Sequence, residues 1–248
     1  MATNEEEEIK KEFQLERMVL FTDAVFAIIL TIMVLEIRLP EGLRHASEEH
    51  VREVFKEVAL KFAAYVVSFA LVARFWVSHL KLFRYLKDYD NKLIVLNLLF
   101  LFSVSLFPFV VSLISGNISI KLPEYVWGWT AYVFALYSCV YVQSLITQHL
   151  IKNKETLCIK VDQLETAYKY KIARINLYLL PAIMIAILIF VFMGLPYNFV
   201  LYTVIAYGIV SGRLRKKYYP GKDTGGPLIA RLFKSKKKPA VAAGETRK

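Results

Sequence analysis

The chain has 248 residues, of which 56% are hydrophobic and 14% aromatic, and its formal net charge is +11. This apolar share exceeds that of an ordinary soluble domain, and a soluble helical protein with this sequence would need several helices buried on every face. The composition therefore argues against a soluble enzyme and indicates an all-α, polytopic membrane protein.

The apolar segments of the chain predict six transmembrane helices. Residues 1–16 are rich in charged side chains, and no apolar core precedes a cleavage site there, so we expect no signal peptide. A bilayer core of roughly 30 Å requires about 20 apolar residues in a helix. Six segments approach this length, namely 18–37, 58–82, 93–114, 125–146, 175–193 and a shorter one at 196–210. We expect one membrane domain over residues 17–213, between an N-terminal segment, 1–16, and a basic tail, 214–248.

Basic residues set the expected orientation of these helices. Lys and Arg gather before the first segment, between the second and third, between the fourth and fifth, and after the sixth. Because cytoplasmic flanks carry the excess of Lys and Arg, both termini are expected in the cytoplasm. The tail sequence RLFKSKKK then lies in solvent or against anionic lipid. No fold motif for nucleic-acid binding accompanies it, so we expect no nucleic-acid partner.

The first segment contains a single acid, Asp23, about a turn and a half inside its apolar run. On a helical wheel Asp23 lies about 140° from Ile28 and is therefore expected to face other helices. An ionisable group in hydrocarbon is costly unless it has partners. The topology places His79 and Asn97 at the depth of Asp23, and Trp76, one turn from His79, could donate its indole N–H. The alternative is an acid that reaches water or bonds only the first amides of its own helix.

Another face of the first segment carries no charge. Ala24, Thr31, Ile32 and Leu35 lie within about 60° of Ile28 on the wheel. Four copies of this stripe around a rotation axis could enclose a passage, in which rings of Ile28 and Leu35 would be apolar constrictions with a ring of Thr31 hydroxyls between them. Contact with lipid or with the core of the same chain is the alternative, and the residues alone favour it.

Other kinds of site have little support in the sequence. Cys139 and Cys158 are expected at different depths and form no disulfide, and no zinc-protease motif or nucleophile elbow is present. We therefore expect no enzyme activity, metal or cofactor. The string TVIAYGIVSG, 203–212, has the wrong order for the carbonyl filter of ordinary potassium channels and is interpreted as a packing helix.

Two other classes of membrane protein are alternatives for this sequence. A secondary transporter or proton-coupled carrier typically contains internal repeats and interrupted helices with several midplane charges, and neither is evident in this sequence. A packing subunit of a larger complex stays open as well.

Three motifs resemble one family of channels. RMVLFTD, 17–23, matches the Arg-x-x-x-Phe-Ser-Asp signature that opens the first helix of the lysosomal-type potassium channel family of transmembrane protein 175, with Thr22 in place of Ser. WVSHL, 76–80, and LNLLFLFSVSLFPF, 96–109, resemble the second and third helices of that family. The resemblance covers about residues 17–109, and the later helices are similar only in hydropathy. A single six-helix unit is similar to the prokaryotic members, which assemble as tetramers.

The resemblance implies a function and a set of site residues. It implies a potassium-selective channel in a prokaryotic cell membrane, a homotetramer whose pore is lined by the first helix of each subunit and lacks the usual carbonyl filter. Potassium ions would permeate without any cofactor. The pore-lining and gating residues would be Ala24, Ile28, Ile32 and Leu35, with ion selectivity at Thr31. The expected structural polar network comprises Arg17, Thr22, Asp23, Trp76, His79 and Asn97.

Overall fold

The computed structural model describes residues 2–37, 48–116, 122–159, 161–194 and 198–219, and this part of the chain is almost entirely helical. The only β feature among these residues is an isolated bridge between Leu86 and Cys158. The helices are α1 (Ala2–Ile32), η1 (Met33–Glu36), α2 (Glu48–Phe83), α3 (Asn91–Ser105), α4 (Phe107–Gly116), α5 (Leu122–Lys152), α6 (Lys154–Leu157), η3 (Val161–Gln163), α7 (Leu164–Ala167), α8 (Tyr170–Phe192) and α9 (Asn198–Tyr218).

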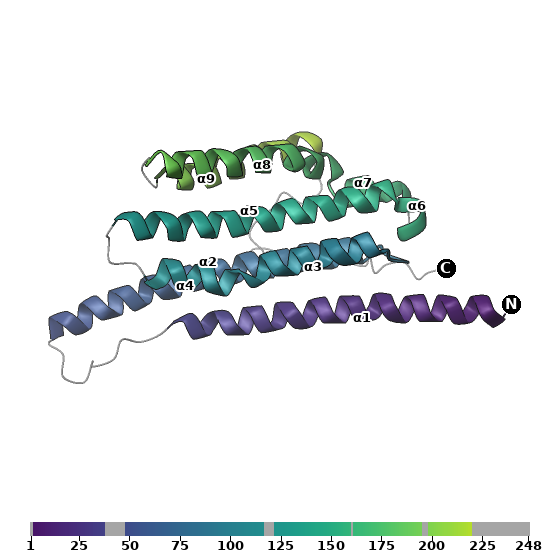
Figure 1. Cartoon of the computed structure of the whole chain (residues 1–248), viewed down its shortest axis with the longest axis horizontal. Coiled ribbons are helices and arrows are strands. Elements are labelled where there is room, and N and C mark those ends of the chain that lie inside the picture. Colours follow the sequence, from purple (N-terminus) through teal and green to yellow (C-terminus); the bar gives the residue numbers. More distant parts are fainter. Residues whose placement is uncertain (1, 38–47, 117–121, 160, 195–197, 220–248) are drawn as a thin grey trace, which may run out of the picture.

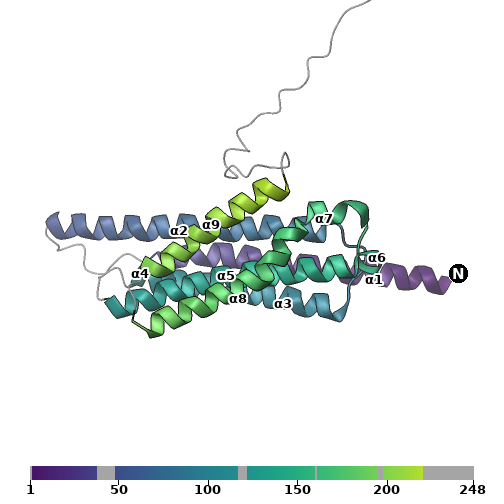
Figure 2. The ribbon, with the colours of Figure 1, turned by 90° about the horizontal axis from the view of Figure 1, so that it is seen from above.

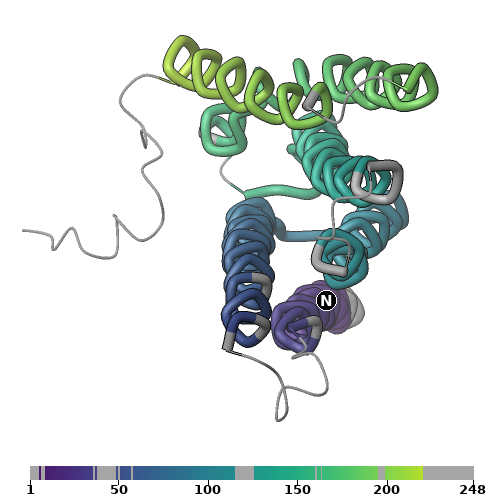
Figure 3. The backbone as a smooth tube through the Cα atoms, turned by 90° about the vertical axis from the view of Figure 1, so that its left-hand side faces the viewer, coloured from purple at the N-terminus to yellow at the C-terminus, as the bar shows by residue number. Residues whose placement is uncertain are grey.

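The long helices lie roughly parallel in layers (Figure 1). α1 is at one side, α2, α3 and α4 pack on it, α5 covers these, and α8 and α9 form the opposite side. The view along the helices shows α1 beside α2 and places the α8–α9 pair farthest from α1 (Figure 3). The chain therefore builds its bundle outward from α1, which is covered by other helices on one side only.

One face of α1 supplies the contact with the bundle. Thr22, Phe26, Ile29 and Met33 follow one another at spacings of three and four residues, which places them on a single helix face. Their exposed fractions are 0, 1, 5 and 0%, respectively. The facing core comes from α2 and α3, where Val72 and Phe100 are both fully buried. Residues beside this face, such as Val25 and Leu30, pack partly against the core, and the face opposite to it stays exposed.

Five helices among the described residues are long and apolar enough to cross a membrane: Ile9–Leu35, Val51–Phe83, Asn91–Ile114, Val126–Lys152 and Tyr170–Phe192. They correspond to the first five expected segments. The sixth expected segment lies in α9, which is not one of the five, so the count of six is not confirmed. α9 contains polar residues along its length and has three basic residues in its last turn, which shortens its apolar run. The chain is thus an all-α membrane protein.

Helices extend beyond the bundle at both ends. α1 begins at Ala2, so the N-terminal segment expected at 1–16 continues directly into the first membrane helix. The first turns of α2 project at the opposite end (Figure 2). α9 continues past residue 213, where we expected the membrane domain to end, and the remainder of the expected tail, 220–248, lies outside the described residues.

Two helices change their geometry at similar depth. α1 gives way to the 3-10 helix η1 at Met33. The third expected segment, predicted as one helix with a kink at Pro108, is divided at Leu106 into α3 and α4. Pro108 follows the division, and because proline has no backbone N–H it cannot continue the hydrogen-bond ladder of α3. η1 packs against α4, the helix that begins at this division.

The connection between α5 and α8 is docked on the end of α2. The Tyr168 hydroxyl donates to the carbonyl oxygen of Leu82 at 2.7 Å, and the Ile159 N–H donates to the carbonyl of Tyr85 at 2.8 Å. Cys158 lies beneath this contact and is 1% exposed. Burial raises the pKa of the Cys158 thiol, because the thiolate would lose its hydration there.

Candidate functional site

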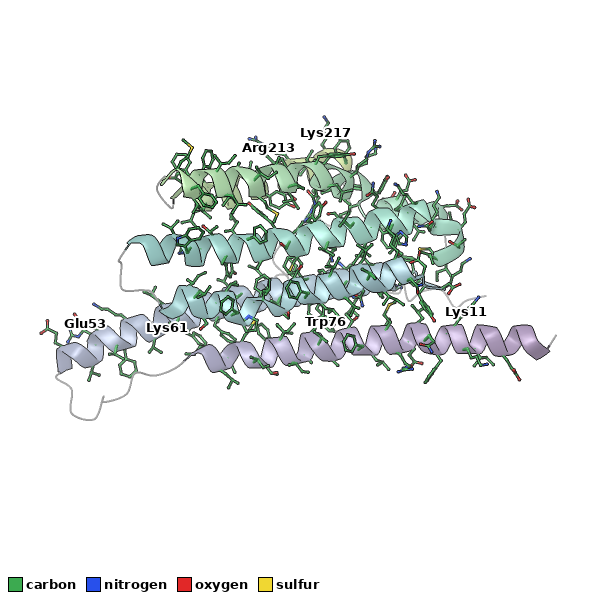
Figure 4. All side chains as sticks on the ribbon, in the orientation of Figure 1. Lys11, Glu53, Lys61, Trp76, Arg213 and Lys217 are labelled. Carbon is green, nitrogen blue, oxygen red and sulfur yellow. The ribbon has the colours of Figure 1, made fainter. Side chains whose placement is uncertain are left out.

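The single acid of the α1 membrane segment has a partner on α2. The indole Nε1–H of Trp76 donates to Asp23 Oδ1 at 2.8 Å. Trp76 lies between α1 and the layer formed by α2 and α3 (Figure 4). A charge-assisted bond of this kind offsets part of the cost of placing a carboxylate in an apolar layer. Sequence considerations placed His79 and Asn97 at the depth of Asp23 and named Trp76 as a possible donor. In the structure Trp76 donates to Asp23, whereas His79 bonds to Asn97.

A second chain of hydrogen bonds joins the first three membrane helices. His79 Nε2 lies 2.8 Å from Asn97 Oδ1, and because that oxygen can only accept, the imidazole donates. The Asn97 amide donates in turn to the Thr22 hydroxyl at 2.9 Å, and Thr22 donates to the carbonyl of Met18. Thr22, His79 and Asn97 are each at most 1% exposed. Every bond runs in one direction, so the side chains hold one another in a single arrangement.

Aromatic rings enclose the imidazole of this chain. The ring of His79 stacks on Phe83 with centroids 3.9 Å apart and on Phe100 with centroids 5.3 Å apart. Phe26 of α1 lies 6.3 Å from the same imidazole. These rings surround the hydrogen bond between His79 and Asn97. In such an apolar place, loss of either partner would leave the other side chain with an unpaired polar group. Sequence considerations did not identify Phe83 and Phe100, although Phe83 lies one helical turn after His79 and could have been found by that spacing.

The expected network has one member outside the cluster. Arg17 is exposed, and its guanidinium lies 5.9 Å from the ring centroid of Phe13, four residues earlier on α1. The other five residues, Thr22, Asp23, Trp76, His79 and Asn97, are linked in the two sets just described. We call these five the polar network.

The uncharged stripe of α1 lies on the surface of the single chain. Ile28, Ile32 and Leu35 are 55, 43 and 67% exposed, and Ala24 and Thr31 are exposed as well. These exposed residues lie on the side of α1 away from the buried face that begins at Thr22. Leu35 belongs to η1, where the tighter helix rotates it relative to the α-helical wheel.

The hydroxyl of Thr31 is turned toward its own backbone. Thr31 Oγ1 lies 3.0 Å from the carbonyl oxygen of Ala27 and 2.9 Å from that of Ile28. The hydroxyl hydrogen is therefore donated within the helix, while the oxygen keeps its lone pairs for another contact. Since the residue is exposed, that contact is available only from outside the chain.

A groove adjoins the stripe. It has a volume of about 490 Å³ and is lined by Ile28 and Ile32 of α1 and by Ser105, Pro108 and Phe109 at the division between α3 and α4. Its lining is mostly apolar, and Phe109 is 60% exposed. Sequence considerations did not identify these α3–α4 residues. Pro108, beside the division of the helix, was the one sign in the sequence of an irregular surface at this place.

The described part of the chain offers little support for metal binding or redox chemistry. Within it, no group of three His, Cys, Asp or Glu side chains is placed to hold a metal ion. Cys139 and Cys158 are both buried and free.

The segment that holds this site is similar to a known family of channels. Residues 17–108 match the family model described as endosomal/lysosomal potassium channel TMEM175. A potassium channel of Chryseobacterium sp. (strain P1-3) is 39% identical over 92 residues, which cover 37% of this chain and 44% of the relative. A potassium channel of Chamaesiphon minutus is 32% identical over 110 residues, which cover 44% and 53%, respectively. Human endosomal/lysosomal proton channel TMEM175 is 26% identical over 79% of this chain and 38% of its own length.

A solved structure shares the fold. The crystal structure of a lysosomal potassium-selective channel TMEM175 homologue from Chamaesiphon minutus superposes with a TM-score of 0.55 at 22% identity, covering 80% of this chain and 98% of that one. The matched part of the present chain spans only about half the length of the bacterial relatives named above. The family match itself includes the whole polar network and the whole uncharged stripe. Residues 17–108 of the chain therefore resemble the TMEM175 family of endosomal/lysosomal potassium channels.

Proposed function

We propose that the protein is a potassium-selective cation channel and not an enzyme, and that four copies surround a pore lined by α1. The observation that carries the proposal is the uncharged stripe from Ala24 to Leu35, which is exposed although the opposite face of the same helix is buried. Rotational symmetry brings such a stripe to a common axis from every subunit. The bacterial relatives named as potassium channels support the choice of ion.

Within this proposal, the residues of the stripe have different tasks. Ile28, Ile32 and Leu35 offer no atom that can replace a water ligand, so their rings act through pore width and wetting. Ala24 lines the inner part of the pore. Thr31 presents an oxygen whose hydrogen is already donated to the backbone, and four such oxygens would supply acceptors to an ion that has lost water. Discrimination between ions is therefore assigned to Thr31.

The polar network is proposed to hold α1 at a fixed rotation. Asp23 is fastened to α2 through Trp76, and Thr22 is fastened to α3 through Asn97. These two residues are adjacent on α1 but bond to different helices, so rotation of α1 would break one or both bonds. A fixed rotation keeps Ile28 and Thr31 directed toward the axis. The membrane domain would follow the expected orientation, with both termini in the cytoplasm of a prokaryotic cell.

The experiment that tests this proposal compares two variants of the stripe in planar bilayers. Ile28→Asn should raise unitary conductance and weaken the preference for potassium, because a polar ring lets sodium pass with its water attached. Thr31→Val keeps the shape of the side chain but removes the oxygen, so it should lower the potassium preference without loss of assembly. The measurement is the bi-ionic reversal potential, with Thr31→Ser as the control that retains a hydroxyl. Unchanged potassium-to-sodium ratios in both variants would reject this stripe as the selective part of the pore.

A second candidate is proton conduction, because the vertebrate relatives are named as proton channels. Currents recorded with equal potassium and a pH difference across the bilayer separate the two ions. A reversal potential that follows the proton gradient would favour this candidate. The alternative of a secondary transporter or proton-coupled carrier is separated by the same recordings, since only a channel gives unitary steps.

A further inference from the structure

The paired ends of α8 and α9 carry a surface of one charge sign. Neither helix contains Asp or Glu, whereas both are basic at the end where α8 begins and α9 finishes. The exposed basic residues there are Lys171, Arg174, Arg213, Lys216 and Lys217. Arg213 and Lys217 point away from the bundle on the outermost layer (Figure 4). An anion that approaches from outside would relieve the repulsion between these like charges.

The side chains of two lysines converge at this end. Lys171 Nζ lies 5.3 Å and Lys217 Nζ lies 5.7 Å from the ring centroid of Tyr218, so one lysine from each helix shares the same aromatic ring. The backbone N–H of Lys171 also donates to the Tyr219 hydroxyl at 3.2 Å, which ties the two helix ends together. Glu165 is close enough to Tyr219 to act on it electrostatically, but its carboxylate lies 4.0 Å from a different cation, Lys154. The two ammonium groups therefore form a small basic site with a fixed aromatic wall.

The position of this site in the membrane decides its partner. The uncharged part of α8 begins directly after Arg174, so Lys171 lies about one turn outside the hydrocarbon layer. At this depth the available anions are the phosphates of lipid headgroups, and tyrosine rings are typical of the same layer. Ammonium groups donate short charge-assisted hydrogen bonds to phosphate oxygens.

We propose that Lys171 and Lys217, which both lie against the ring of Tyr218, bind the headgroup of an anionic phospholipid. The site lies outside the family match, which ends at residue 108, and on the far side of the bundle from α1. It is therefore independent of the proposed pore. At low salt, each of the two lysines should contribute roughly a five-fold preference for anionic over zwitterionic lipid.

The test uses the purified full chain in micelles that contain equal amounts of phosphatidylglycerol and phosphatidylcholine, with native mass spectrometry of the retained lipid. The wild type should retain phosphatidylglycerol preferentially, and rising salt should weaken the preference. The double variant Lys171→Gln/Lys217→Gln should lose most of it. The matched control is Lys92→Gln/Lys152→Gln, which removes the same charge from exposed positions on α3 and α5 near the same end of the bundle.

Three results would overturn the proposal. The first is equal retention of the two lipids by the wild type. The second is an equal loss in the test and control variants, which would mean that total charge alone attracts the lipid. The third is saturable binding of inorganic phosphate without retention of phosphatidylglycerol, which would make the site one for a free anion. None of these readouts requires current, so failure here leaves the channel proposal untouched.

Discussion

The bond between Asp23 and Trp76 is the residue-scale feature most open to test. Asp23→Ala removes the acceptor of the Trp76 indole N–H in an apolar layer. We expect a loss of about 1–3 kcal/mol in the free energy of unfolding, because a donor without a partner is costly there. The measurement is thermal unfolding in detergent, together with the oligomeric state of the variant.

The control for this change is Asp23→Asn, which keeps an acceptor at the same place and should lose less stability. Assembly and expression should fall in Asp23→Ala before ion preference changes. A well-assembled Asp23→Ala channel with altered selectivity would place this acid in the permeation path instead of behind it.

Thr22 provides an independent residue-scale test. Thr22→Val preserves the shape of the side chain and removes the acceptor of the Asn97 amide, in a place that is 0% exposed. The expected cost is again about 1–3 kcal/mol, because Asn97 is then left with an unpaired buried donor. Thr22→Ser retains the hydroxyl and should keep most of the stability. Equal unfolding midpoints for Thr22→Val and the wild type would show that this bond does not stabilise the fold.

Depth could be predicted from the sequence at this scale, and Trp76 was named as a possible donor, whereas the pairing of Asn97 with His79 and Thr22 could not be predicted. Counting residues from the helix ends placed Asp23, His79 and Asn97 in one layer, because helical rise is nearly constant. Pairing depends on the rotation of α2 about its own axis, which directs Trp76 toward α1 and His79 toward α3. Composition of the apolar surface does not determine that rotation. The outward position of Arg17 likewise depends on where the neighbouring helices end.

At the scale of elements, the docked connection between α5 and α8 predicts protection of a thiol. Cys158 should react slowly with maleimide at neutral pH, because burial both hides the thiol and raises its pKa. Tyr168→Phe removes the hydroxyl that donates to the Leu82 carbonyl. Since one such bond contributes about 1 kcal/mol, we expect labelling to accelerate roughly five-fold. The rate of labelling is followed by mass spectrometry, with Cys158→Ser to show the contribution of Cys139.

The same thiol predicts a direction for the effect of pH. A group whose pKa is raised in the folded state contributes its stability below the unfolded pKa, about 8.5 for cysteine, and loses it as the pH rises further. Docking of the connection should therefore weaken above about pH 9. Labelling of Cys158 that is already fast at pH 7 would contradict the docked position.

The sequence predicted which segments form helices more accurately than it predicted where a helix is interrupted. The apolar run 93–114 predicts one helix with a kink at Pro108, because its hydropathy has no interruption, yet the chain divides at Leu106 into two helices. The signal was Pro108, which removes a donor from the ladder without changing hydropathy. The residues 196–210 were long enough to suggest a sixth span, but α9 is not among the five candidate spans.

At the scale of the whole molecule, the exposed stripe predicts association of the chain with itself. The purified protein should have four times the mass of the 28.6 kDa chain in native mass spectrometry. The reason is that the stripe occurs once in the sequence and cannot enclose a passage alone. Cross-linking should give a ladder that ends at four chains. A ladder that ends at two, or a monodisperse single chain, would reject the shared pore.

The arrangement of the layers could not be read from the sequence. Hydropathy identifies membrane segments, but it does not indicate that α5 separates α3 from α8, since all of these helices are apolar around much of their circumference. The contact faces are decided by shape and by a few polar bonds. The uncharged stripe of α1 was visible in advance because it differs in kind from the face that carries Asp23.

The backbone hydrogen bond of Thr31 has a consequence for the sign of the charge that can pass. Because the hydroxyl hydrogen is held by the Ala27 and Ile28 carbonyls, a chloride ion at this ring would meet only oxygen lone pairs and no donor. The described stripe contains no acidic side chain that could repel anions. Anions would then be excluded by the orientation of neutral dipoles. A ring of Thr31 oxygens would favour cations over anions without any charged side chain.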